Sequence, residues 1–119
     1  MDIEGDPIFW ADASLEKIET THDDVALHLH EDTGAKKLLH CLGHVGFQMI
    51  GFWDELIIEN ATMPLEHSFI ADCERRLEKL PASGTATRHR AGNRLLEVTF
   101  LDGCRLWVCA HRFHCVRVL

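Results

Sequence analysis

Two short stretches of the chain concentrate the side chains that zinc accepts as ligands. One runs from His40 to His44 and the other from Cys109 to Cys115. A closed zinc site needs four such ligands converging at about 2.0–2.3 Å from the metal. Neither stretch has the Cys-x-x-Cys or His-Glu-x-x-His spacing of common zinc motifs. The main prediction is therefore a protein without a cofactor, and a small zinc-binding protein is the alternative. The ligands of that alternative are His40, His44, Cys109, His111 and His114.

The cysteines offer a second chemistry, because a thiolate is a nucleophile when an imidazole or a helix N-terminus stabilises it. Cys109 is followed two residues later by His111, and in a strand these side chains share a face. A thiol/histidine enzyme that uses Cys109, His111 and His114 is thus a further form of the alternative. Cys73 lies on the apolar side of a predicted helix, where burial is expected to raise its pKa.

The sequence lacks the motifs of the common cofactor-binding and serine-nucleophile sites. It contains no Gly-x-Gly-x-x-Gly, no Walker loop and no Gly-x-Ser-x-Gly. The acid pairs Asp23-Asp24 and Glu31-Asp32 flank a predicted strand, where acids are usually solvated turn residues. We assign no catalytic residue and favour a protein without catalytic activity.

Acidic and basic side chains are distributed unevenly along the chain. Residues 1–32 carry ten acids against a single lysine, whereas residues 81–119 carry six arginines against two acids. The net charge of the whole chain is −7 at pH 7. Such asymmetry influences association and the choice of partner. The acidic N-terminal region therefore predicts a basic protein partner.

Two predicted strands add imidazole and aromatic side chains to that surface. His28 and His30 share the outer face of one strand, and Trp107 lies on one face of another. If the two faces coincide on one side of a sheet, they form a patch rimmed by acids, which suits a protein interface. The predicted partner-binding residues are Asp12, Asp23, Asp24, His28, His30 and Trp107.

Other partners follow from weaker signals. Arg88, Arg90 and Arg94 could contact phosphates, but a net charge of −7 opposes binding to a polyanion, so nucleic acid is disfavoured. The chain has no apolar run of the roughly 18 residues that a membrane span requires, so we expect no membrane partner. A homodimer that pairs through the edge of the last strand, ending at Leu119, stays open.

The elements that must position these residues follow from the periodicity of apolar side chains. Residues 24–30 alternate apolar and polar side chains, as a half-buried strand does. Residues 65–80 place their apolar side chains on one stripe at helical spacing. Asp102-Gly103 between two alternating runs predicts a β-hairpin of residues 94–101 and 104–110.

The rest of the chain completes the predicted arrangement. Leu15 and Ile18 are three residues apart, which predicts a short helical turn within residues 11–19. Residues 82–93 are small, polar and basic and predict an exposed loop. Further strands are expected at residues 37–42, 43–51, 53–63 and 113–119.

Together these elements predict an α+β fold. It consists of one antiparallel sheet of about six strands, a meander plus a C-terminal hairpin, with the helix of residues 65–80 on one face. A chain of 119 residues has the usual size of one domain, so residues 1–119 are expected to form one. Five cysteines leave at least one unpaired, and the N-terminus is acidic where a secretory signal is basic and then apolar. We therefore expect a cytoplasmic location, where thiols stay reduced.

The first part of the chain resembles small bacterial immunity-type domains in three segments, which are Phe9-Trp-Ala-Asp12-Ala-Ser-Leu15-Glu-Lys-Ile18, Val25-Ala-Leu-His-Leu29 and Phe52-Trp-Asp54-Glu55. In that group an Asp-Ala dipeptide near the start precedes a β-meander and one helix. The resemblance implies a non-catalytic protein that binds and blocks a toxin, and an acidic surface would suit a basic nuclease. The resulting hypothesis is a non-catalytic cytoplasmic protein-binding module, with immunity-type neutralisation of a basic partner as its specific form.

Overall fold

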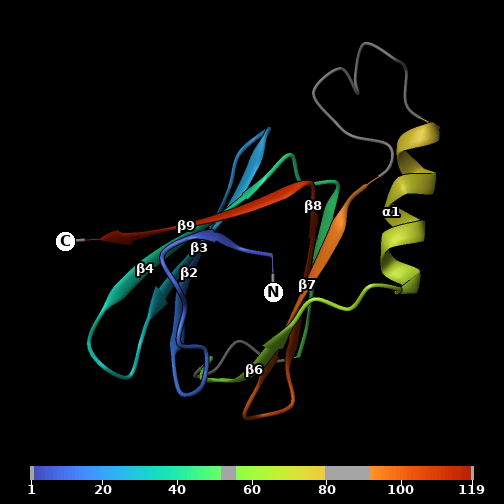
Figure 1. Ribbon diagram of the computed structural model, residues 1–119. Coiled ribbons are helices and arrows are strands. Elements are labelled where there is room, and N and C mark those ends of the chain that lie inside the picture. Colours follow the sequence, from blue (N-terminus) through green and yellow to red (C-terminus); the bar gives the residue numbers. More distant parts are fainter. Residues whose placement is uncertain (1, 52–55, 80–91, 119) are drawn as a thin grey trace.

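The computed structural model describes residues 2–51, 56–79 and 92–118. Within these residues the chain forms nine strands and one helix (Figure 1). In chain order the elements are β1 (Glu4–Gly5), β2 (Ser14–Thr20), β3 (Asp24–His30), β4 (Lys36–Leu42), β5 (Gly46–Ile50), β6 (Ile58–Thr62), α1 (Ser68–Glu78), β7 (Arg94–Phe100), β8 (Arg105–Ala110) and β9 (Arg112–Val118).

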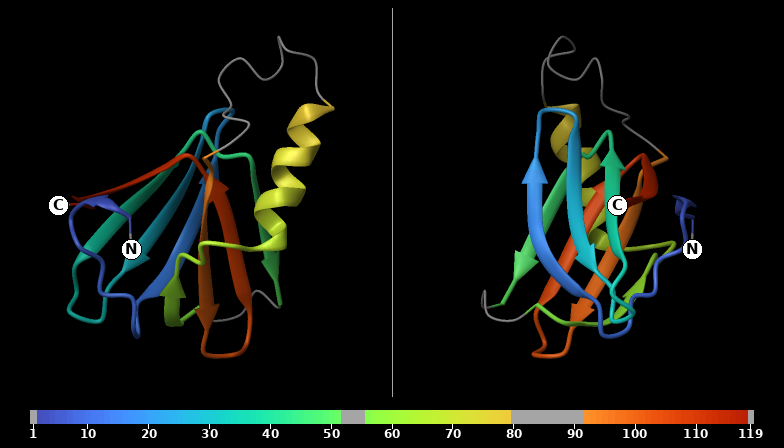
Figure 2. Two further views of the ribbon diagram at one scale, coloured as in Figure 1. Left: turned by 45° about the vertical axis from the view of Figure 1, so that its right-hand side comes forward. Right: turned by 90° about the vertical axis from the view of Figure 1, so that its left-hand side faces the viewer.

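The strands form two sheets that pack against each other (Figure 2). The five-stranded sheet has the order β1-β9-β4-β3-β2, and the four-stranded sheet has the order β5-β8-β7-β6. The short pair of β1 with β9 is parallel, and the other strand pairs of the described residues are antiparallel. The architecture is therefore a β-sandwich with one helix outside it.

The chain passes from one sheet to the other between β4 and β5 and again between β8 and β9. The His111 N–H donates to the Leu42 carbonyl at 3.1 Å, and the Val45 N–H donates to the Cys109 carbonyl at 2.8 Å. These bonds hold the two crossings together. Elsewhere an isolated antiparallel bridge joins Ser14 of β2 to Ile57, just before β6. The sheets are thus linked at more than one place.

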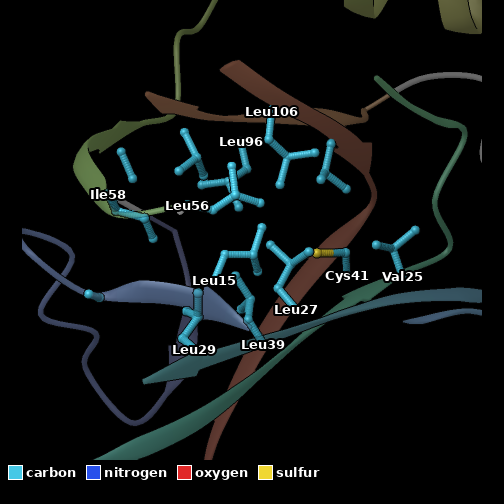
Figure 3. Packing of buried hydrophobic residues seen from close by; sticks show 14 of the residues in the cluster. Leu15, Val25, Leu27, Leu29, Leu39, Cys41, Leu56, Ile58, Leu96 and Leu106 are labelled. Carbon is cyan, nitrogen blue, oxygen red and sulfur yellow. The ribbon is translucent and has the colours of Figure 1, made fainter. Parts of the chain in front are cut away.

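The space between the sheets holds the main hydrophobic core (Figure 3). Leu27 and Leu39 of the five-stranded sheet face Leu96 and Leu106 of the four-stranded sheet, and all four are fully buried. The period-two pattern of strands such as β3 explains this arrangement, because every second side chain points inward. Each leucine removed from water in this way contributes roughly 1.5–3 kcal/mol before entropy is counted.

Helix α1 packs on the outer face of the four-stranded sheet (Figure 1). Its N-cap is His67, whose Nδ1 accepts the Phe69 N–H at 3.1 Å. The helix buries Cys73 and Leu77, and Cys73 forms a second apolar cluster with Leu95 of β7 and Cys109 of β8. β7 and β8 therefore have apolar side chains on both faces, one toward the main core and one toward α1.

The predicted single sheet of about six strands with a helix on one face is wrong. The reason lies in residues 94–118. β7 and β8 form the predicted hairpin, but after His111 the chain enters the other sheet as β9. Side-chain alternation shows which face of a strand is buried and does not show which sheet the strand joins. The alternation within residues 94–118 therefore predicts one meander, although β9 belongs to the other sheet.

The predicted helical turn at residues 11–19 is also wrong, because most of this segment is strand β2. The register of β2 with β3 shifts between Leu15 and Lys17, which marks a β-bulge at Glu16. A bulge adds one residue, so Leu15 and Ile18 lie on the same face although they are three residues apart. The spacing that indicates one turn of helix is here the signature of a bulged strand.

Several other predicted elements are confirmed. The strand at residues 24–30 is β3, and the helix within residues 65–80 is α1. The Asp102-Gly103 turn joins β7 to β8, with Gly103 at φ 89° and the Asp102 carboxylate accepting the Cys104 N–H at 3.0 Å. Residues 52–55 and most of the predicted basic loop at 82–93 lie outside the described residues.

Candidate functional site

The outer face of the five-stranded sheet carries four histidines from three adjacent strands. His28 and His30 come from β3, His40 from β4 and His114 from β9, and all four are half-buried. They lie on one face because each occupies an outward position in the alternation of its strand. We call the outer surface of β3, β4 and β9 the histidine face. Figure 2, right, looks onto this face, with α1 behind the sheets.

The strand register places these side chains next to one another. His40 is directly opposite His114, and Leu38 lies between His28 and Val116. Directly opposed residues have Cβ atoms about 4.5–5.5 Å apart, within reach of one another. Val116 is 36% exposed, so the face combines imidazoles with an accessible aliphatic row. Such a mixture suits contact with another protein surface.

Carboxylates on β2 are hydrogen-bonded to two of the histidines. Glu19 Oε1 lies 2.5 Å from His28 Nε2, and Glu16 Oε1 lies 2.9 Å from His30 Nδ1. The hydrogen bond to His28, with a smaller contribution from the charge of Lys17, lowers the pKa of the exposed Glu19 carboxyl below its ordinary value. The Glu19 carboxylate therefore keeps its negative charge to a lower pH than an isolated glutamate would.

The opposite edge of the same sheet also carries a carboxylate, which is paired with an arginine. Glu4 of β1 accepts a hydrogen bond from Arg112 at 2.6 Å, and this contact lowers the pKa of the exposed Glu4 carboxyl. β1 and β2 are the two edges of the five-stranded sheet. The acids of the first part of the sequence thus border the histidine face on both sides.

A hollow of about 200 Å³ lies on the histidine face near the turn between β2 and β3. Its lining consists of Glu19, Thr21, Asp24, Ala26, His28, Leu38 and His40. Asp23 and Asp24 therefore lie at one end of the face. Asp12 precedes β2 in a left-handed conformation (φ 64°), at the other end of that strand. A seven-residue strand is roughly 20 Å long, so the three predicted aspartates flank the face and do not cluster.

Trp107 lies on the opposite side of the molecule, because β8 belongs to the four-stranded sheet. Its Nε1 donates to Glu97 Oε2 at 2.7 Å, and its ring centroid lies 4.9 Å from that of His67 and 5.5 Å from that of Phe69. The start of α1 thus half-covers it. The structure does not bring Trp107 into one patch with His28 and His30.

The residues of the zinc alternative are also separated. His40 and His114 are neighbours on the histidine face, whereas Cys109 is buried beneath α1 on the four-stranded sheet. His44 and His111 lie at the two crossings between the sheets. Within residues 2–51, 56–79 and 92–118, no three His, Cys, Asp or Glu side chains are grouped so that they could hold a metal ion. The geometry therefore does not support this ligand set.

The Cys109 thiol is hydrogen-bonded to the thiol of Cys73. The expectation that burial raises the pKa of Cys73 is wrong, because this hydrogen bond outweighs burial and lowers the pKa. The same contact, together with burial, raises the pKa of Cys109. In the main core, burial alone dominates: it raises the pKa of Cys41 and brings that of Cys115 to about 11.

Sequence reasoning missed this thiol pair, because the two residues lie far apart in the chain. The usable signal was indirect. Cys73 belongs to the apolar stripe of the predicted helix, and Cys109 shares a strand face with Trp107, which such a helix could cover. Cys73 and Cys109 come together only because α1 packs on the four-stranded sheet.

The strand edge suggested for a homodimer is partly occupied. β9 pairs with β4 along its whole length, and β1 pairs with the other side of β9 only at His114 and Cys115. Leu119 itself lies outside the described residues. No helix among the described residues is long and apolar enough to cross a membrane.

Comparison with known proteins gives no assignment. No protein-family model matches the chain, and no curated protein and no solved structure matches it. A functional conclusion must therefore come from the geometry of the molecule.

Proposed function

We propose that this chain is a non-catalytic protein-binding module that binds a basic partner through the histidine face and its acidic borders. The observation that carries the proposal is the uncovered sheet face. His28, His30, His40 and His114 lie there with Leu38 and Val116, and no described strand or helix packs over them. Helix α1 packs on the four-stranded sheet and therefore does not cover the histidine face of the five-stranded sheet.

The chemistry of this face favours a protein over a small molecule. The hollow of about 200 Å³ on it is smaller than the roughly 300–1,000 Å³ of usual ligand pockets. Imidazole and aliphatic side chains in the centre, with carboxylates at the rim, correspond to the core and rim of a protein interface. The net charge of −7 and the acids on both edges would steer a positively charged protein toward the face.

Two finer statements belong to the same proposal. Neutralisation of a basic toxin is the specific form of binding that the immunity-type resemblance of the first half of the chain implies. A cytoplasmic location is supported by the five cysteines, which are all buried as free thiols. Free thiols persist in a reducing compartment.

Charge reversal tests the proposal. The protein is coupled to a resin and exposed to a cell lysate at low salt, and retained proteins are eluted with increasing salt and identified by mass spectrometry. We expect the parent protein to retain basic proteins. The same proteins should elute at a lower salt concentration from the triple variant Asp12→Lys/Asp23→Lys/Asp24→Lys. The control is Glu59→Lys/Glu66→Lys/Glu78→Lys, which makes the same change of charge on exposed residues of β6, α1 and the segment before it. If the basic proteins elute at the same salt concentration from both triple variants, this would contradict the proposal that they bind specifically at the histidine face.

A second pair of variants tests the face without changing charge. Leu38→Gln places a polar amide at the centre of the histidine face, between His28 and Val116. Leu101→Gln makes the same change at an exposed position of the β7–β8 turn, which is 58% exposed. We expect Leu38→Gln alone to weaken capture of the proteins identified above. Unchanged capture by Leu38→Gln would place the binding surface elsewhere.

A further inference from the structure

Two thiols meet where helix α1 packs on the four-stranded sheet. Cys73 comes from the middle of α1 and Cys109 from β8, and each is almost fully buried. Their side chains are hydrogen-bonded to each other. Around them lie Leu95 and the half-buried Phe69 and Trp107. The pair is thus set in a small apolar cluster, separate from the main core.

One side of this cluster opens into a groove between β5 and α1. The groove has a volume of about 340 Å³, and Cys73 forms part of its wall. Its lining consists of Val45, Gly46, Phe47, Gln48, Phe69, Asp72, Cys73 and Arg76. A small molecule in the groove can therefore reach the Cys73 side chain, whereas Cys109 does not line the groove.

Gly46 makes room for the Cys73 sulfur. A Cβ atom at residue 46 would lie 2.6 Å from Cys73 Sγ, which is closer than such atoms approach in proteins. The glycine is thus required by the space that the sulfur occupies at the edge of the groove. Because residue 46 has no side chain, the Cys73 thiol fits between β5 on one side and Cys109 on the other.

The two thiols differ in their readiness to ionise. The hydrogen bond from Cys109 lowers the pKa of Cys73, and the positive charge of Arg76 acts in the same direction. The hydrogen bond to Cys73 and burial raise the pKa of Cys109. Cys73 is therefore the first of the pair to form a thiolate, which is the reactive form of cysteine.

We propose that Cys73 and Cys109 are a redox-active thiol pair, which a small hydroperoxide entering the groove converts into a disulfide between α1 and β8. Cys73 is the attacking thiol and Cys109 is the resolving thiol. This inference stands on the thiol contact and the groove, and it does not depend on the proposed protein-binding function.

The reaction balances with hydrogen peroxide as the oxidant. The Cys73 thiolate attacks one oxygen, the O–O bond breaks, and the departing hydroxide takes up the proton released from Cys73 and leaves as water. Cys73 is now a sulfenic acid. The Cys109 sulfur attacks the Cys73 sulfur, the S–O bond breaks, and the hydroxyl leaves with the Cys109 proton as a second water. Two thiols are oxidised to one disulfide, and one peroxide is reduced to two waters.

The first step also prepares the second. The largest cause of the raised pKa of Cys109 is its hydrogen bond to the Cys73 sulfur. That bond is changed once the sulfur carries a hydroxyl group, so Cys109 can then give up its proton more easily. The other three cysteines, Cys41, Cys104 and Cys115, lie in the main core between the sheets. They lack access from the groove and are expected to stay reduced.

Peptide mapping of the full chain tests this inference. The reduced protein is treated at pH 7 with a small molar excess of hydrogen peroxide, remaining thiols are blocked with an alkylating reagent, and the protein is digested without reduction. We expect the free thiols to fall from five to three and one linked pair of peptides, containing Cys73 and Cys109, to dominate. Five free thiols after treatment, or links that mainly involve Cys41, Cys104 or Cys115, would overturn the proposal.

Three alanine variants separate the roles of the thiols. Cys109→Ala should accumulate a sulfenic acid at Cys73 that dimedone traps, whereas Cys73→Ala should leave Cys109 unmodified. Cys115→Ala is the control and should form the disulfide as the parent protein does, because Cys115 lies in the main core. Modification of Cys109 in Cys73→Ala at the parent rate would contradict the assigned roles. If a variant does not fold, the peptide map of the parent protein decides.

Discussion

At the scale of single residues, the least expected feature is a buried ion pair. Glu31 and Lys37 are 3% and 6% exposed, and Lys37 Nζ lies 3.5 Å from Glu31 Oε2. Glu31 also accepts the Phe9 N–H at 2.8 Å, and Lys37 donates to the Pro7 carbonyl at 2.6 Å. The pair therefore ties the segment before β2 to the hairpin of β3 and β4.

Removing one member of this pair should strongly destabilise the protein. Glu31→Gln leaves the Lys37 ammonium buried without a countercharge, so we expect the free energy of unfolding to fall by about 3–5 kcal/mol. Urea denaturation at pH 7 measures this loss, and adding Lys37→Met to Glu31→Gln should recover part of it. Lys17→Met is the control, because Lys17 forms an exposed pair with Glu19 at 3.5 Å. That variant should change stability by less than about 1 kcal/mol. A loss for Glu31→Gln as small as that of the control would contradict the expectation.

The sequence predicts Glu31 as a solvated turn residue, and this is wrong for a physical reason. Its position next to a strand end is typical of exposed acids. Its burial depends on Pro7 and Phe9, whose chain segment is far away in sequence and has no periodic pattern that would place it there. By contrast, Val25, Leu27 and Leu29 alternate within a single strand, and their burial could be predicted from that strand alone.

At the scale of elements, β5 and α1 approach closely only because residue 46 is a glycine. A Cβ there would meet Cys73 Sγ at 2.6 Å and the Phe69 ring at 3.7 Å. The β5 strand is also an edge of its sheet, paired only with β8 among the described strands. The position of α1 thus depends on the absence of one side chain on a neighbouring strand.

Gly46→Ala should therefore destabilise the packing of α1 against β5. Overpacking of this kind costs about 1–3 kcal/mol, measured as the change in free energy of unfolding in urea. The matched background is Cys73→Ala, which removes the sulfur and should reduce the cost of Gly46→Ala. A double-mutant cycle isolates this coupling. If Gly46→Ala costs the same with and without the sulfur, the contact with Cys73 is not its cause.

Elements were predictable where the signal is local. The β7–β8 hairpin followed from Asp102-Gly103, because a tight turn fixes two adjacent strands. The sequence of β2 predicts a helical turn, because a β-bulge at Glu16 gives Leu15 and Ile18 a spacing that a helix also uses. The histidines of β3 were correctly placed on an outer face, but their separation from Trp107 depends on which sheet each strand joins.

At the scale of the whole molecule, the two sheets share one core, whereas α1 covers a smaller cluster of its own. The main core takes side chains from both sheets, including Cys41 and Cys115 of the five-stranded sheet and Cys104 beside β8. The α1 cluster contains Cys73 and Cys109. We therefore expect the sheets to unfold together and α1 to detach more easily, since few buried contacts hold it.

Thiol labelling in the native state tests this difference. A bulky maleimide should modify Cys73 through local opening of α1, whereas Cys41, Cys104 and Cys115 should react only through global unfolding. Global unfolding of a domain requires about 5–15 kcal/mol, so labelling of the core thiols should be slower by orders of magnitude. Mass spectrometry of tryptic peptides gives the rate for each thiol. Equal rates for Cys41 and Cys73 would contradict a separate opening of α1.

The charge asymmetry of the sequence became interpretable only at this scale. Of the ten acids in residues 1–32, Glu4 lies in β1 and Glu16 and Glu19 lie in β2, and these two strands are opposite edges of the five-stranded sheet. Composition indicated an acidic region, but the insertion of β9, β4 and β3 between those edges decides what the acids surround. Pairing between strands so distant in sequence leaves no local signal in the residues themselves.

The place of β9 between β1 and β4 also has a consequence for biosynthesis. β4 is made about 70 residues before the strand that pairs with it on that side. While the chain emerges from the ribosome, β4 therefore has an unpaired edge. The inward-facing side chains of β4 also lack the side chains of β9 beside them. Such an edge invites pairing with other nascent chains. The five-stranded sheet, with its histidine face, can be completed only after translation has passed residue 118.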